Sequence, residues 1–134
     1  MNKALSVGLD GIKPLAKKIA QGLSGGEIFA LTGTLGAGKT TFVKAVGKEL
    51  KIRNRISSPT FILLQAFEAK LRSKKPIVLY HLDLYRTKNF KEAKALGLTE
   101  FWGRPNTVTF IEWGDKIKRH LPAKAKIIQF SGKQ

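Results

Sequence analysis

The chain has 134 residues, 43% of them apolar, and its 25 Lys and Arg against nine Asp and Glu give a net charge of +16. This length predicts one domain, residues 1–134, with enough chain for a hydrophobic core. No apolar run approaches the ~18 residues of a membrane span, the first seven residues lack the apolar core of a secretory signal, and the absence of cysteine excludes disulfides and thiolate metal sites. We therefore expect a cytoplasmic protein.

The first half of the sequence predicts a helix, a strand and a second helix. Apolar residues at helical spacing, with lysines opposite, predict a helix over residues 10–23, which Ser24-Gly25-Gly26 ends. Pro14 would lie in its first turn, where proline is tolerated. An apolar run predicts a buried strand over 27–32, and a helix is predicted over 40–50.

The second half is richer in strands. Apolar runs predict strands over 60–68 and 76–83, and the short polar connector at 69–75 predicts that they form a hairpin. A helix over 89–96, a strand over 107–113, a short helix over 115–120 and a last strand over 126–130 follow. Strands that alternate with helices indicate an α/β layered fold, and the hairpin makes its sheet mixed.

Residues 33–40 read Gly-Thr-Leu-Gly-Ala-Gly-Lys-Thr, a complete G-x-x-x-x-G-K-[ST] phosphate-binding loop between a strand and a helix. Its glycines allow a tight turn whose N–H groups, with the following helix N-terminus, point at phosphate oxygens. Lys39 can reach the β- and γ-phosphates, and Thr40 can offer a hydroxyl to Mg²⁺. The alternative is a glycine-rich turn that binds nothing, which the complete motif and its strand-to-helix setting disfavour. We expect ATP and Mg²⁺ as cofactors and a three-layer, P-loop NTPase-like α/β fold with a mixed, mostly parallel central sheet. The cofactor-binding residues would be Gly33, Thr34, Leu35, Gly36, Ala37, Gly38, Lys39, Thr40 and Thr41.

Two carboxylates stand at the ends of apolar strands, Asp83 after residues 77–82 and Glu112 after residues 107–111. Ligands of α/β sheets bind at the carboxyl ends of strands, so either acid can hold Mg²⁺ while the other completes the ion's shell or orients attacking water. For each acid, pairing with a surface lysine is the structural alternative. His81 lies two residues before Asp83, hence on the same face of the strand. It could bond a phosphate, orient Asp83 or be a structural histidine.

Four segments occur together in this chain: residues 35–41 (Leu-Gly-Ala-Gly-Lys-Thr-Thr), 58–61 (Ser-Pro-Thr-Phe), 81–86 (His-Leu-Asp-Leu-Tyr-Arg) and 111–114 (Ile-Glu-Trp-Gly). The set resembles the bacterial ATPase family of tRNA threonylcarbamoyladenosine biosynthesis, the TsaE family. The first segment is generic among nucleotide-binding proteins, and the other three, at these separations, are specific. The resemblance runs from about Ile12 through Phe130.

The resemblance implies an ATP-binding and hydrolysing accessory subunit for the t⁶A modification of adenosine 37 in tRNA. Such a subunit acts with the TsaD–TsaB transferase complex and is slow alone. Thr40 and Glu112 would be Mg²⁺ ligands and Asp83 the Walker B acid and a third metal-binding residue, so that Lys39, Asp83 and Glu112 form the catalytic set. Ser58, Pro59 and Thr60 would form a switch-like loop. His81, Tyr85, Arg86 and Trp113 would lie at the site rim, near the site or on the partner surface.

The chain departs from the family pattern at three places. Thr34 stands where the family usually has Asp, Glu or Asn, and Ile12 stands where it often has a Thr that touches the nucleotide. The sequence ends at Gln134, where many relatives continue.

Two other classes of function remain open from the sequence. A small-molecule or nucleoside kinase would use the same loop, although no arginine-rich lid segment is evident. A basic nucleic-acid-binding protein with a vestigial loop would explain the charge, although the aromatic residues fall in apolar runs and not among the basic ones. The charge indicates either a polyanionic partner, with weak electrostatic contact to tRNA, or a lysine-rich solvated surface, because the basic residues are dispersed.

Overall fold

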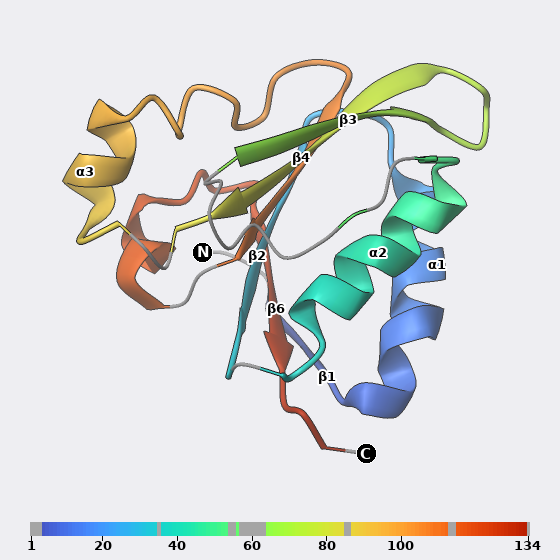
Figure 1. Cartoon of the computed structure of the whole chain (residues 1–134), viewed down its shortest axis with the longest axis horizontal. Helices are drawn as coiled ribbons and strands as arrows, with labels where there is room; N and C mark the ends of the chain where they lie inside the picture. The colour runs from blue at the N-terminus through green and yellow to red at the C-terminus, as the bar shows by residue number, and fades with distance from the viewer. Residues whose placement is uncertain are drawn as a thin grey trace.

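A six-stranded sheet with the strand order β1-β6-β2-β5-β4-β3 runs through the molecule (Figure 1). This computed structural model describes residues 4–34, 36–53, 56, 64–84, 87–112 and 115–133, without the side chains of 115–117. The strands are β1 (Ala4–Val7), β2 (Glu27–Gly33), β3 (Leu64–Lys70), β4 (Pro76–Asp83), β5 (Thr107–Glu112) and β6 (Lys126–Phe130). All neighbouring pairs are parallel except β3–β4, which is antiparallel. The predicted hairpin and the mixed, mostly parallel sheet are therefore confirmed.

Helices cover both faces of the sheet. The 3-10 helix η1 (Leu9–Gly11) leads into α1 (Ile12–Gly22), which lies beside α2 (Lys39–Glu49) on one face (Figure 1). The short helix α3 (Phe90–Ala95) lies on the other face, and the 3-10 helix η2 (Asp115–His120) follows β5. Two separate clusters of buried apolar residues fill the spaces on the two sides of the sheet. This is the predicted three-layer α/β architecture.

The larger cluster is built around aromatic rings of the central strands. Phe110 on β5 stacks on Phe29 of β2 with ring centroids 5.3 Å apart. Phe42 of α2 meets Phe110 and Phe130 edge-on at 5.8 and 5.5 Å, an arrangement that aromatic quadrupoles favour. Every residue of β5 is buried, as expected for a central parallel strand covered on both faces.

The structure differs from the sequence prediction mainly at element ends. The first helix, predicted from Asp10, begins as a 3-10 turn and becomes α-helical at Ile12, with Pro14 in its first turn. The strand predicted to end at Glu68 continues to Lys70, and its predicted start lies outside the described residues. The strand β1 was not predicted at all, because three of its four residues are exposed and give no alternating pattern. Among the described residues, no helix is long and apolar enough to cross a membrane.

Candidate functional site

The phosphate-binding loop joins the end of β2 to the start of α2, at the carboxyl edge of the parallel strands (Figure 1). Ala37 N–H donates to the Thr34 carbonyl at 3.1 Å, and Phe42 N–H donates to the Gly38 carbonyl at 2.9 Å. Gly33 has φ +140°, and a Cβ there would lie 2.5 Å from the Phe130 carbonyl oxygen. The glycine that opens the motif is thus needed for two reasons, its backbone conformation and the close approach of β6.

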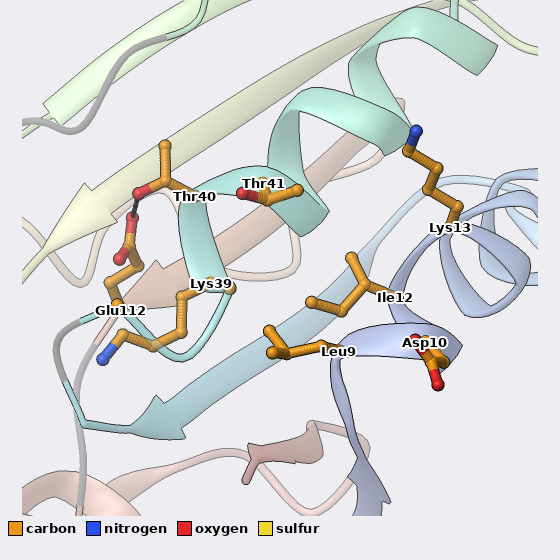
Figure 2. Close-up of a pocket in the computed structure, with 10 residues that line it drawn as sticks. Leu9, Asp10, Ile12, Lys13, Lys39, Thr40, Thr41 and Glu112 are labelled. Carbon is orange, nitrogen blue, oxygen red and sulfur yellow. Dashed lines mark hydrogen bonds between the residues drawn. The ribbon is translucent and has the colours of Figure 1, made fainter. Parts of the chain in front are cut away.

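A cavity of about 470 Å³ lies beside this loop (Figure 2). Residues of η1 and α1 line one side of it and residues of the loop, α2 and β5 line the other. The lining consists of Leu9, Asp10, Ile12, Lys13, Gly36, Gly38, Lys39, Thr40, Thr41 and Glu112. Five predicted cofactor-binding residues therefore border one cavity with the predicted metal ligand Glu112. Gly33, Thr34 and Ala37 belong to the loop but not to the lining, and Leu35 lies outside the described residues.

The apolar side of the cavity was not predicted. Leu9 and Ile12 face the loop across the cavity in Figure 2, while Asp10 and Lys13 lie at its margin. Ile12 is only 3% exposed, and its Cδ1 lies 2.2 Å from where a Cβ on Gly38 would be. In the sequence Ile12 stands out only as a departure from the family pattern, and no local signal links it to a loop more than 20 residues away.

Lys39 is the first residue of α2 and is 7% exposed. Its ammonium group hydrogen-bonds to the carbonyl of Gly33 and, at 3.4 Å, to that of Thr34. These two carbonyl groups are neutral, whereas phosphate oxygens are charged and form stronger bonds with an ammonium group. A phosphate group on the loop can therefore compete with these carbonyls for the Lys39 side chain.

Glu112 is the point where three elements meet. Thr40 Oγ1, from α2, donates to Glu112 Oε2 at 3.5 Å (dashed line in Figure 2). His81 Nε2, from β4, contacts the same oxygen. A carboxylate only accepts hydrogen bonds, so the His81 Nε2 must be the donor. Glu112 is 6% exposed and His81 is fully buried. His81, expected at the site rim or on a partner surface, is therefore a core residue, because a side chain without exposure cannot contact a partner.

Asp83 lies next to Glu112 but one strand further from the loop. The two residues are register partners on the parallel strands β4 and β5, so their side chains leave the same face of the sheet. Glu112 pairs in turn with Leu31 on β2, the strand that leads into the loop. Asp83 is only partly buried and does not line the cavity. The strand order thus brings Glu112, and not Asp83, to the hydroxyl of Thr40.

Thr40 and Glu112 fit a magnesium site of the kind found with bound phosphates. Thr40 Oγ1 lies 3.5 Å from Glu112 Oε2, so the hydroxyl and the carboxylate are close enough for both side chains to reach one ion, which Mg²⁺ binds through oxygen ligands. A hydroxyl has one proton and two lone pairs, so Thr40 can donate to Glu112 and still face a cation. The described residues include no cluster of three His, Cys, Asp or Glu that could hold a metal, but Mg²⁺ needs only one or two protein ligands when phosphates supply others.

Several predicted site residues lie outside the part of the chain that the structure describes. These are Ser58, Pro59 and Thr60 of the switch-like loop, together with Tyr85, Arg86 and Trp113. Their proposed roles stay predictions.

Comparison with known proteins identifies the family. The family model described as "Threonylcarbamoyl adenosine biosynthesis protein TsaE" matches residues 8–134. Three relatives, each named "tRNA threonylcarbamoyladenosine biosynthesis protein TsaE", come from Aquifex aeolicus, Bacillus subtilis and Treponema pallidum. The Aquifex protein is 42% identical over 106 residues, which cover 78% of this chain and 70% of the relative. The Bacillus protein is 36% identical over 110 residues (82% and 65%), and the Treponema protein is 38% identical over 101 residues (75% and 69%). The chain thus spans about two thirds of the length of these relatives, and it belongs to the TsaE family.

Proposed function

We propose that the chain is a Mg²⁺-dependent P-loop ATPase that acts as an accessory subunit in tRNA threonylcarbamoyladenosine biosynthesis. One observation supports the ATPase activity above all others: the loop residues Lys39 and Thr40 border the same cavity as Glu112, and Thr40 bonds directly to that carboxylate. A phosphate-binding loop and a candidate magnesium ligand would therefore contact the same bound nucleotide.

Each residue has a distinct role in this proposal. The loop N–H groups and the N-terminus of α2 would bind the phosphates of ATP. Lys39 would exchange its carbonyl partners for β- and γ-phosphate oxygens. Thr40 and Glu112 would hold Mg²⁺, which when bound neutralises charge that develops on the transferred phosphoryl group. Asp83, one strand away, would orient the attacking water or complete the shell of the ion. Leu9 and Ile12 would exclude water from the opposite side.

The biological role follows from the names of the relatives and from the family. The relatives from Aquifex and Bacillus are named for tRNA threonylcarbamoyladenosine biosynthesis. We infer that this chain serves the same pathway with a TsaD–TsaB type transferase, and that hydrolysis is slow in the isolated chain. In this proposal Ser58, Pro59 and Thr60 respond to the γ-phosphate as a switch, and tRNA is contacted weakly through the basic surface or only through the partners.

The ATPase proposal is tested with Lys39→Ala, which removes the long cation directed at the β- and γ-phosphates. We expect ATP turnover or affinity to fall by about an order of magnitude or more. Lys17→Ala is the matched control, because Lys17 is an exposed lysine on α1 that does not line the cavity. Unchanged turnover and affinity in Lys39→Ala would overturn the proposal. Radiolabelled γ-phosphate must appear as free phosphate, since transfer to an added acceptor would instead identify a kinase.

A further inference from the structure

His81 is a polar residue in the core, and its bond to Glu112 is the feature that explains it. We propose that His81 is a positioning residue that fixes the Glu112 carboxylate so that one of its oxygens faces the cavity. The inference rests on the proposed function, since it concerns how the candidate magnesium ligand is oriented. His81 does not line the cavity, so it would act only through Glu112.

The two oxygens of Glu112 have different surroundings. Oε2 receives both protein donors, Thr40 Oγ1 and His81 Nε2. Within the described part of the chain, no hydrogen bond is made to Oε1, and Glu112 lines the cavity. The arrangement anchors one oxygen and leaves the other for a cation or a metal-bound water. Figure 2 shows one oxygen of the Glu112 carboxylate directed at Thr40.

The anchoring depends mainly on His81. The Thr40 contact is 3.5 Å long, at the outer limit of a hydrogen bond, so the bond from His81 Nε2 is the contact that can hold this oxygen in place. Glutamate has three rotatable side-chain bonds, so a single long contact would leave its carboxylate free to turn. In many metal sites, a residue that hydrogen-bonds to a metal ligand without contacting the metal fixes the orientation of that ligand in the same way.

The burial of His81 supports the same conclusion. The ring is fully buried on β4, where its register partner on β5 is the core residue Phe110. Its Nδ1 atom is buried without a hydrogen-bond partner among the described residues. Burying an unpaired polar atom costs free energy that an apolar side chain of similar size would not incur. Among the residues that the structure describes, the bond from Nε2 to Glu112 is the polar contact that offsets this cost.

The experiment compares His81→Gln with His81→Met. The Gln side chain can place an amide N–H near the position of the imidazole Nε2, and Met has a similar length and no strong donor. Both side chains are unbranched at Cβ and Cγ and replace a ring, so both variants lose similar packing, and the difference between them reports the hydrogen bond. Binding of a fluorescent ATP analogue is measured against Mg²⁺ concentration, and again in EDTA.

We expect His81→Met to raise the Mg²⁺ concentration needed for half-maximal binding by about 10–100-fold. His81→Gln should restore most of this loss, and binding in EDTA should be the same in both variants, because the loop is untouched. In a Glu112→Gln background, His81→Met should cause little further loss, since residues that act through one another are not additive. Urea unfolding of the unmodified chain, His81→Met, Glu112→Gln and the double variant, without nucleotide or Mg²⁺, should show the same coupling between the two positions.

Three results would overturn the inference. His81→Met could need no more Mg²⁺ for half-maximal binding than the unmodified chain. It could lose affinity for the ATP analogue equally with Mg²⁺ and in EDTA. Its effect on the Mg²⁺ requirement could also add fully to that of Glu112→Gln. Each of these would make His81 a packing residue only. The proposed function fails separately, if the unmodified chain itself shows no Mg²⁺-dependent binding of the ATP analogue.

Discussion

Gly38 gives the sharpest test of how the loop and the first helix are fitted together. Its φ is +106°, well beyond the left-handed helical region that L residues tolerate, and a Cβ there would lie 2.2 Å from Ile12 Cδ1. In Gly38→Ala the backbone strain costs about 1–3 kcal/mol. Moving the buried Ile12 side chain away from its rotamer adds about 0.5–1.5 kcal/mol. We therefore expect the free energy of unfolding to fall by roughly 1.5–4.5 kcal/mol.

Gly36→Ala is the matched control. Gly36 also has a positive φ, +80°, but a Cβ there would meet nothing within 4 Å. Its cost should be the backbone strain alone, about 1–3 kcal/mol. The two variants are compared by urea unfolding followed by circular dichroism, and by affinity for ATP. Gly38→Ala should be the worse in both assays, because it also displaces the apolar wall of the cavity.

The contact itself is isolated with Ile12→Val, which removes the Cδ1 atom that the new Cβ would strike. Alone, this change should cost about 0.5–1.5 kcal/mol. Combined with Gly38→Ala it should cost less than the two single changes together, by about 1 kcal/mol. The reasoning is refuted if Gly38→Ala and Gly36→Ala are equally stable and the effects of Gly38→Ala and Ile12→Val are simply additive.

Four further predictions follow from the core, the acids, the switch-like loop and the charge. Phe42→Ala, which empties a fully buried site between two rings, should lower the free energy of unfolding by about 3–5 kcal/mol; the half-buried Phe67 serves as a control that should cost clearly less. Glu112→Gln should weaken Mg²⁺-dependent ATP binding, because an amide is a poorer ligand than a carboxylate, while Asp83→Asn should keep the fold and lower hydrolysis; wild-type hydrolysis in both would contradict the metal site. Pull-down with the transferase complex should require ATP and weaken in Thr60→Ala, and equal recovery with ATP, ADP and no nucleotide would exclude the coupling. If the +16 charge contacts tRNA, affinity of the assembled complex should fall with salt with a log–log slope of roughly −0.7 to −0.9 per phosphate neutralised; a slope and affinity unchanged by adding this chain would assign the charge to the surface alone.

Local features of this protein could be predicted from the sequence because they depend on neighbouring residues. The phosphate-binding loop is eight consecutive residues, and its strand and helix are set by apolar spacing on either side. The hairpin followed from two apolar runs with a short connector between them. Glu112 and Asp83 were identified as candidates because each directly follows a run of buried strand residues. None of these inferences needed to know which strand lies beside which.

The relation between distant segments was decided only by the tertiary structure. Periodicity identifies a segment as a strand but does not reveal which strands it pairs with. It therefore could not show that β5 lies next to β2 and brings Glu112 to Thr40. For the same reason β1 was missed, since it is held by pairing with β6, in which Ala4 lies opposite Ile127. The apolar wall formed by Leu9 and Ile12 exists because α1 packs beside α2. The burial of His81 against Glu112 likewise depends on strand order and helix packing, which are set by the free energy of the whole core and not by any local pattern of residues.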